Sequence, residues 1–177
     1  MTQYTVLNIT AKKALMTLMH LLEKAESHVK EKGIDESSLL TASLAPDMFN
    51  FTKQVQVATD DARRNLCLLA GKEHVKMEDN EKTIAELKER INKTREVIDT
   101  LRESDFADAD ERHISLYWMG GAYVLGKDFV TELAIPNLMF HTVTAYGILR
   151  AQGLNIGKAD FATGLSMHQP TEVKKED

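Results

Sequence analysis

Cysteine and long apolar runs are both scarce in this sequence of 177 residues. The single cysteine, Cys67, cannot form a disulfide within the chain, so an ordinary hydrophobic core has to hold the fold. No apolar stretch approaches the roughly 20 residues that cross a bilayer, and the first residues lack the basic and apolar regions of a secretion signal. These absences predict a cytoplasmic protein without a membrane segment.

Positive charge is outnumbered by negative charge. The chain has 22 Lys and Arg against 27 Asp and Glu, a net charge of −5 at pH 7. Proteins that bind nucleic acid neutralise its phosphates with clustered Lys and Arg, so we expect no nucleic-acid partner. Glycine-rich phosphate loops and the Ser, His and Asp order of hydrolases are missing too.

Apolar residues recur at three- and four-residue spacing in four segments of the chain. This period predicts helices near 5–32, 47–70, 80–102 and 128–152. Pro46 with Asp47 is expected to open the second helix and Asp128 to cap the fourth, while Pro136 should kink it. The expected helix stops are Gly33, Gly71 and Gly153.

Four such helices predict an all-α four-helix bundle, of either the up-and-down or the crossover type. We expect helices that are neighbours in the sequence to pack antiparallel. Residues 113–125 are typical of a short hairpin or extended loop before the last helix, with Gly120 and Gly121 at its turn. One domain is predicted over 1–164, followed by a polar, loose tail over 165–177.

The last helix carries the most informative motif, Asn137 and His141 four residues apart. Both lie on the apolar stripe of that helix, so both side chains should point inward. One interpretation is a core histidine satisfied by a buried amide. The other is a functional group, because histidine is the best acid or base near neutral pH.

The second helix contains a matching polar cluster, Gln54 to Asp61. On a helical wheel Gln54 lies at the edge of the apolar stripe and Gln56 lies well off it. Position alone therefore favours Gln54 as the group that faces the last helix.

These two helices resemble the DinB/YfiT-like superfamily of metalloenzymes, and most closely a branch of it formed by domains of unknown function. The resemblance covers about residues 4–161, and its main matching stretches are 44–48, 54–58, 136–137, 140–141 and 144–150. It implies a four-helix bundle whose usual metal site is one His on the second helix and a His-x3-His pair on the last.

The resemblance places His141 on the second His of that pair, Asn137 on the first and Gln56 on the His of the second helix. The site would then be Gln/Asn/His. Neutral amides are poor ligands for zinc, so we expect no resident cofactor, with a divalent metal at His141 as the weaker alternative.

The sequence thus predicts a small-molecule-binding bundle with a degenerate metal site, in which His141 acts as general acid or base without a metal. The residues expected around the ligand are Asn137, Gln56, Gln54, Asp60, Tyr146, Trp118, Met48 and Phe140. Two alternatives stay open: a divalent-metal-dependent transferase of the DinB/YfiT type, and a structural module. The structural module would form a homodimer. An open cavity that reaches His141 would favour ligand binding over this alternative.

Overall fold

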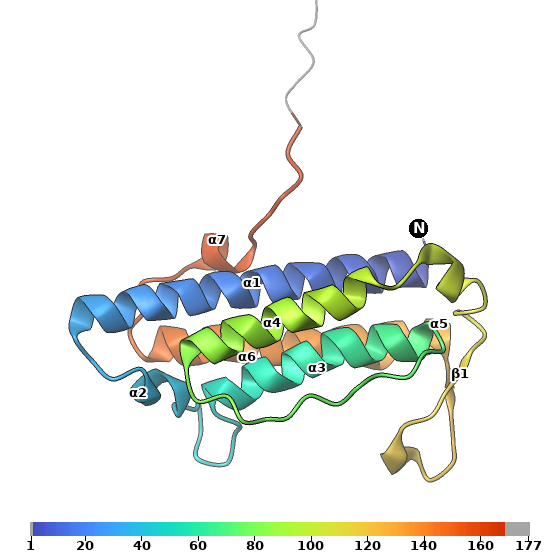
Figure 1. Cartoon of the computed structure of the whole chain (residues 1–177), viewed down its shortest axis with the longest axis horizontal. Helices are drawn as coiled ribbons and strands as arrows, with labels where there is room; N and C mark the ends of the chain where they lie inside the picture. Colours follow the sequence, from blue (N-terminus) through green and yellow to red (C-terminus); the bar gives the residue numbers. More distant parts are fainter. Residues whose placement is uncertain (1, 169–177) are drawn as a thin grey trace, which may run out of the picture.

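Four long helices pack side by side in the computed structural model, which describes residues 2–168 (Figure 1). They are α1 (Gln3–Lys32), α3 (Phe51–Leu69), α4 (Ile84–Asp99) and α6 (Ile135–Ala151). The shorter elements are α2 (Ser37–Leu40), η1 (Glu103–Phe106), β1 (His113–Ile114), η2 (Tyr117–Met119), β2 (Val124–Leu125), α5 (Gly126–Phe129), η3 (Val130–Ala134) and α7 (Lys158–Phe161). The predicted all-α bundle is confirmed.

Capping residues mark the ends of the helices more exactly than the apolar period does. Gly33 adopts the left-handed conformation that ends α1, as predicted. The start of α3 was predicted wrongly: Pro46 lies in the preceding loop, and Asn50 caps the helix by accepting a backbone N–H of the first turn. Thr83 and Glu86 form a capping box at the start of α4.

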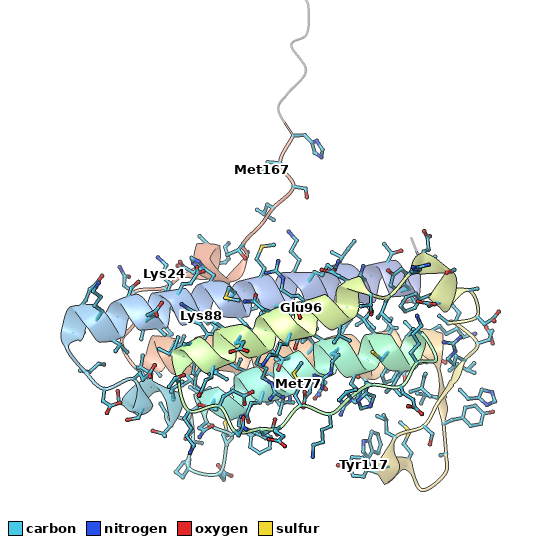
Figure 2. The ribbon with its side chains drawn as sticks, viewed as in Figure 1. Lys24, Met77, Lys88, Glu96, Tyr117 and Met167 are labelled. Carbon is cyan, nitrogen blue, oxygen red and sulfur yellow. The ribbon has the colours of Figure 1, made fainter. Side chains whose placement is uncertain are left out.

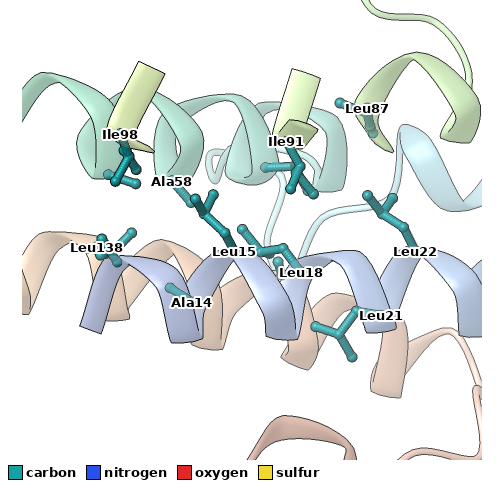
Figure 3. Close-up of a cluster of buried hydrophobic side chains, with 14 of the residues drawn as sticks. Ala14, Leu15, Leu18, Leu21, Leu22, Ala58, Leu87, Ile91, Ile98 and Leu138 are labelled. Atoms are coloured by element: carbon teal, nitrogen blue, oxygen red, sulfur yellow. The ribbon is translucent and has the colours of Figure 1, made fainter. Parts of the chain in front are cut away.

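The core lies along the bundle axis, where the apolar stripes of the four helices meet (Figure 3). Leu15, Leu18 and Leu22 of α1 face the other helices and are fully buried. Each such side chain contributes about 1.5 to 3 kcal/mol by leaving water. The residues that they meet across the bundle include Ala58 of α3, Leu87, Ile91 and Ile98 of α4, and Leu138 of α6.

Helices α3 and α4 run in the same direction, so the expectation that all sequence neighbours pack antiparallel is wrong for this pair (Figure 1). Ion pairs of Lys12 with Asp99 and of Lys88 with Glu26 fix α4 antiparallel to α1. The bundle is therefore of the crossover type, which the sequence had left open.

The connection between α3 and α4, which we call the strap (residues 70–83), makes this arrangement possible. It returns in an extended form along the outer side of α3 (Figure 1). An extended chain covers up to about 3.3 Å per residue, whereas a helix covers about 1.5 Å, so 14 residues can span the 19 residues of α3. Lys53 of α3 pairs with Asp79 of the strap at 2.6 Å.

Arg90 of α4 joins the strap to both helices. Its guanidinium pairs with Asp60 of α3 at 2.8 Å and with Asp79 and Glu81 of the strap at 3.0 and 2.9 Å. It also donates to the Thr59 hydroxyl and to a strap carbonyl. Because Arg90 is fully buried, these contacts replace all the hydration that its charge loses.

The entry to α6 contains a π-helical turn, Val130–Ala134, directly before Pro136. A proline has no N–H to donate and clashes with the carbonyl four residues earlier, and the wider turn relieves both problems. At the position where we predicted a kink, the helix instead widens by one residue in this π-helical turn. The predicted cap at Asp128 is wrong, because the helix already starts at Gly126 and Asp128 lies inside its first turn.

The predicted hairpin exists, but its ladder has only two residues in each strand, His113 with Leu125 and Ile114 with Val124. Residues 117–119, between the two strands, form a 3₁₀ turn. Tyr117 in this turn points away from the bundle (Figure 2). Of the predicted tail, residues 169–177 lie outside the described part of the chain.

Within residues 2–168, none of the helices combines the length and the apolar character that a bilayer crossing needs.

Replacement of Arg90 by Ala should lower the free energy of unfolding by about 3 to 5 kcal/mol, because the partly buried carboxylates around it would lose their counter-charge and Thr59 would lose a buried hydrogen-bond partner. Arg95→Ala on the exposed side of the same helix is the matched control and should change it by less than about 0.5 kcal/mol. Urea denaturation measures both. Equal losses in the two variants would contradict the role of Arg90.

Candidate functional site

Polar side chains meet at two points along the interface of α3 and α6, which we call the seam. Gln54 and Asp61 lie seven residues apart on α3, which is about two turns and hence one face. Asn137 and His141 lie four apart on α6. Because the two helices are antiparallel, Gln54 contacts His141 and Asp61 contacts Asn137.

His141 is held in one tautomer by a chain of hydrogen bonds. The Gln54 amide nitrogen donates to the carbonyl of Phe49 at 3.1 Å, so the Gln54 oxygen faces His141. That oxygen lies 2.7 Å from His141 Nδ1 and must accept, which makes Nδ1 the protonated nitrogen. Burial lowers the pKa of His141, so the ring is neutral at pH 7.

The second ring nitrogen, Nε2, therefore carries a free lone pair. It makes no hydrogen bond with a described residue. It is also not among the unpaired side-chain atoms of residues 2–168 that are fully buried, so solvent reaches it. The whole side chain is 7% exposed. The ring is thus mostly buried, with its Nε2 edge in reach of solvent.

Asp61 forms the other polar contact of the seam. Its carboxylate accepts from Asn137 at 2.5 Å and from Arg64, one turn along α3, at 2.6 Å. Burial raises the pKa of Asp61 to about 6, although Arg64 and the bond from Asn137 act in the opposite direction. Asp61 thus titrates close to neutral pH.

Only part of the expected ligand-binding set lies near His141. Gln54, Phe140 and the loop that carries Met48 do so, and the Phe140 ring packs edge-on at 5.2 Å. Asn137 lies one turn away at Asp61. The other four residues of the set contact groups outside the His141–Gln54 pair: Gln56 bonds Glu81, Asp60 pairs with Arg63 and Arg90, Tyr146 packs against Phe161, and Trp118 belongs to the hairpin.

The choice between the two glutamines is decided by the helix period. Gln56 lies 200° around α3 from Gln54 and faces the strap, where its amide donates to Glu81 at 2.8 Å. Position on the wheel was the correct guide, and the position implied by the superfamily pattern was not. His141 lines none of five pockets of about 220 to 620 Å³ on the described surface, so these pockets do not supply the open cavity that would favour ligand binding.

Sequence reasoning missed Asp61 and Arg64. The signal was available, because Asp61 follows Gln54 by seven residues and so shares its face. The sequence-based set contained Asp60 instead, which pairs with Arg90 on the other side of α3.

The donors of the seam do not fit a zinc or similar metal. His141 supplies the single imidazole, and its Nδ1 is already occupied by Gln54. The carboxylate of the seam, Asp61, is bonded to Arg64 and Asn137. Residues 2–168 hold no group of three or more His, Cys, Asp or Glu side chains arranged for a metal. Amide oxygens would have to supply the remaining ligands, which borderline-soft metals bind poorly.

The raised pKa of Asp61 predicts that it makes the folded chain less stable as pH rises. The unfolded carboxyl, with a pKa of 3.8, loses its proton before the folded one, with a pKa of about 6. The free energy of unfolding therefore falls by about 3 kcal/mol as the pH rises from 4 to 6. Asp61→Asn should abolish this component in urea denaturation at pH 4 and 7.

Other carboxylates also titrate over that range, so the comparison needs a control. Asp108→Asn, on an exposed loop, should keep the pH dependence of the parent chain. An Asp61→Asn chain with that same dependence would show that the carboxyl is not perturbed by burial.

Removal of divalent metals with a chelator should leave the melting temperature within about 1 °C, because a ligand stabilises a fold only if it binds the folded state well. Protein purified without a His tag should carry much less than one equivalent of zinc or nickel by elemental analysis. One equivalent that survives dialysis, together with a fall in melting temperature on chelation, would restore the metalloenzyme alternative.

Comparisons with known proteins agree with this fold. The family described as "Domain of unknown function (DUF1993)" matches residues 3–162. A crystal structure of a DinB family member protein from Shewanella denitrificans is similar over 94% of this chain and 95% of that chain, with a TM-score of 0.90 and 38% sequence identity. No curated protein matches. The chain belongs to the DUF1993 family and has a DinB-like fold.

Proposed function

We propose that this DinB-like bundle binds a small molecule at the edge of His141 and uses Nε2 to accept and return a proton without a metal. The observation that carries the proposal is the fixed tautomer, because the bond from Nδ1 to Gln54 leaves Nε2 as the only free position on the ring. The DinB-like fold gives no substrate, so the chemistry is argued from this edge alone.

The protonation state of the ring suits a base. Burial lowers the pKa of His141, so the lone pair on Nε2 is available at neutral pH. When Nε2 takes a proton, the positive charge spreads to Nδ1–H, which already donates to the Gln54 oxygen at 2.7 Å. The same burial favours return of the proton, so the ring can act as base and then as acid.

Exposed apolar side chains lie on the two segments that hold the His141–Gln54 pair, and they suggest what the ligand offers. Leu44 and Phe49, which precede α3, are 47% and 53% exposed, and Phe140 and Val143 of α6 are 56% and 49% exposed. The Phe49 carbonyl and the Phe140 ring both contact the His141–Gln54 pair directly. A ligand with an apolar body and one acidic N–H or O–H group would satisfy both the aromatic surface and Nε2.

The structural-module alternative draws on two of the same observations. A mostly buried His141 bonded to a glutamine is also what a core histidine needs. The exposed Phe140 and Val143 could equally pack against a second copy of the chain. Self-association stays a prediction, and the experiments below separate it from ligand binding.

Replacement of Gln54 by Glu should raise the pKa of His141 by about 1 or more, because a carboxylate beside Nδ1–H stabilises the charged ring. Gln152→Glu is the matched control, since it adds the same charge at the exposed end of α6, eleven residues from His141, and should leave the pKa of His141 unchanged. Nitrogen-15 NMR of the ring measures the pKa and the tautomer together.

A fragment library screened by the same NMR signals tests the function itself. We expect bound fragments to shift Nε2 of His141 and the rings of Phe49 and Phe140, and to bind at least about tenfold more weakly to His141→Gln. His141→Ala is less useful because loss of a buried ring should cost about 2 to 4 kcal/mol of stability.

Two outcomes would contradict the proposal. One is a parent ring protonated on Nε2, which would leave no lone pair at the edge. The other is a library in which no fragment perturbs Nε2 while sedimentation shows a dimer that Phe140→Glu dissociates, because that result assigns the surface to a second copy.

A further inference from the structure

A pocket of about 270 Å³ lies where α1, α6 and the chain that follows α6 meet. Residues 157–168, which we call the C-terminal segment, include α7, and α7 contacts α1 (Figure 1). Ile9 and Ala14 of α1, Met139 of α6, and Phe161 and Leu165 of the C-terminal segment are part of the lining. Ile9 and Leu165 are 46% and 72% exposed, so a ligand here would cover apolar surface that now meets water.

Three contacts hold the C-terminal segment against both helices. Nε2 of His20 on α1 lies 2.9 Å from the Asp160 carboxylate, and the Thr17 hydroxyl donates to the Phe161 carbonyl at 2.8 Å. The Phe161 ring packs edge-on against Tyr146 of α6, with 5.8 Å between the ring centres. The pocket therefore has fixed walls on all three sides, as ligand pockets usually do.

The threonines of the lining turn their hydroxyl protons to the backbone. Thr10 donates to the Val6 carbonyl at 2.8 Å, and Thr142 donates to the Leu138 carbonyl at 2.8 Å. Thr17 donates to the C-terminal segment, as described above. These three hydroxyls thus have no proton left for a ligand, and the walls act as apolar surface.

Lys13 is the only charged residue in the lining. Its partly buried side chain reaches Gly164, where an added Cβ atom would lie 3.3 Å from the Lys13 Nζ atom. Both chain neighbours of Gly164 line the pocket, so the ammonium group lies at the pocket edge. In the described part of the chain Lys13 meets no carboxylate at ion-pair distance, whereas the adjacent Lys12 pairs with Asp99 at 2.7 Å.

We propose that this pocket binds a medium-chain fatty acid, with the alkyl chain between the apolar walls and the carboxylate on Lys13. One ammonium group matches the single charge of a carboxylate better than the charge of a phosphate monoester, which is about −1.5 to −2. The volume of about 270 Å³ is close to the lower limit of roughly 300 Å³ for ligand pockets, which favours a medium chain over a long one.

The chain and the head group each contribute to this binding. Every methylene that leaves water strengthens binding about fourfold, and the ammonium group adds a charge-assisted hydrogen bond. The pocket shares no lining residue with the His141 edge, so it stands or fails independently of the function proposed above.

Isothermal titration calorimetry of the full chain with octanoate, below the concentration at which it forms micelles, tests the site. Octanoate should bind, and butanoate should bind at least about tenfold more weakly because it buries fewer methylenes. Octylammonium has the same chain with a positive head group, and it should also bind at least about tenfold more weakly because Lys13 repels it. Octanol has the chain without the charge, so its affinity should lie between those of octanoate and octylammonium.

Lys13→Met keeps the length of the side chain and removes its charge. It should weaken octanoate binding about tenfold, by loss of one charge-assisted hydrogen bond, and leave octanol binding unchanged. Lys12→Met is the matched control, because it removes the same charge from the adjacent residue, which faces Asp99 of α4. This control should bind octanoate as the parent does.

Ala162 allows a test of the apolar walls. It lines the pocket and is itself exposed, so Ala162→Phe can fill the space without disturbing the core. This variant should weaken octanoate and octanol alike by at least about tenfold, because it occupies the space of their chains. Ala122→Phe makes the same change at an exposed position of the hairpin and should leave both affinities unchanged.

Absence of octanoate binding by the parent would overturn the proposal, and so would equally tight binding of octylammonium. Equal weakening by Lys13→Met and Lys12→Met would also overturn it, because net charge would then attract the carboxylate. A dimer in sedimentation that Ala162→Phe dissociates, in a parent chain that binds no octanoate, would assign the pocket to a second copy of the chain.

Discussion

The ion-pair cluster around Arg90 is the constraint on which the rest of the bundle depends. A buried guanidinium needs several oxygens, and here they come from α3 and from three residues of the strap. Satisfying it forces the strap to lie along α3, and the strap in turn brings α4 back parallel to α3. One side of α3 is thereby occupied, which leaves the opposite side for α6 and the seam.

Helix α3 consequently has two polar faces with different chemistry. Towards α6 it presents Gln54 and Asp61, which hold His141 and Asn137. Towards the strap it presents Arg63 with donors to spare. Arg64 lies between the faces, because it pairs with Asp61 while its Nε stays unpaired.

The comparison with the superfamily pattern explains why the site was harder to predict than the fold. The pattern pointed to Gln56, but two residues along a helix turn a side chain by about 200°, and Gln56 faces Glu81 of the strap. Asp61 was not predicted as a site residue, because the sequence does not distinguish it from its neighbour Asp60. Which of two adjacent acids is buried depends on the helix packed against each, and Asp61 meets Asn137 whereas Asp60 meets Arg90.

The sequence by itself determined the four helices, because their apolar period reports one buried face, and it determined the stops at Gly33 and Gly71, because left-handed backbone needs glycine. It also placed Asn137 and His141 on one inward face. Only the tertiary structure decided the direction of α4, the burial of Arg63 and Arg90, and the pairing of His141 with Gln54. Each of these depends on groups far apart in the chain, such as Gln54 and His141, and local periodicity carries no information about partners at that separation.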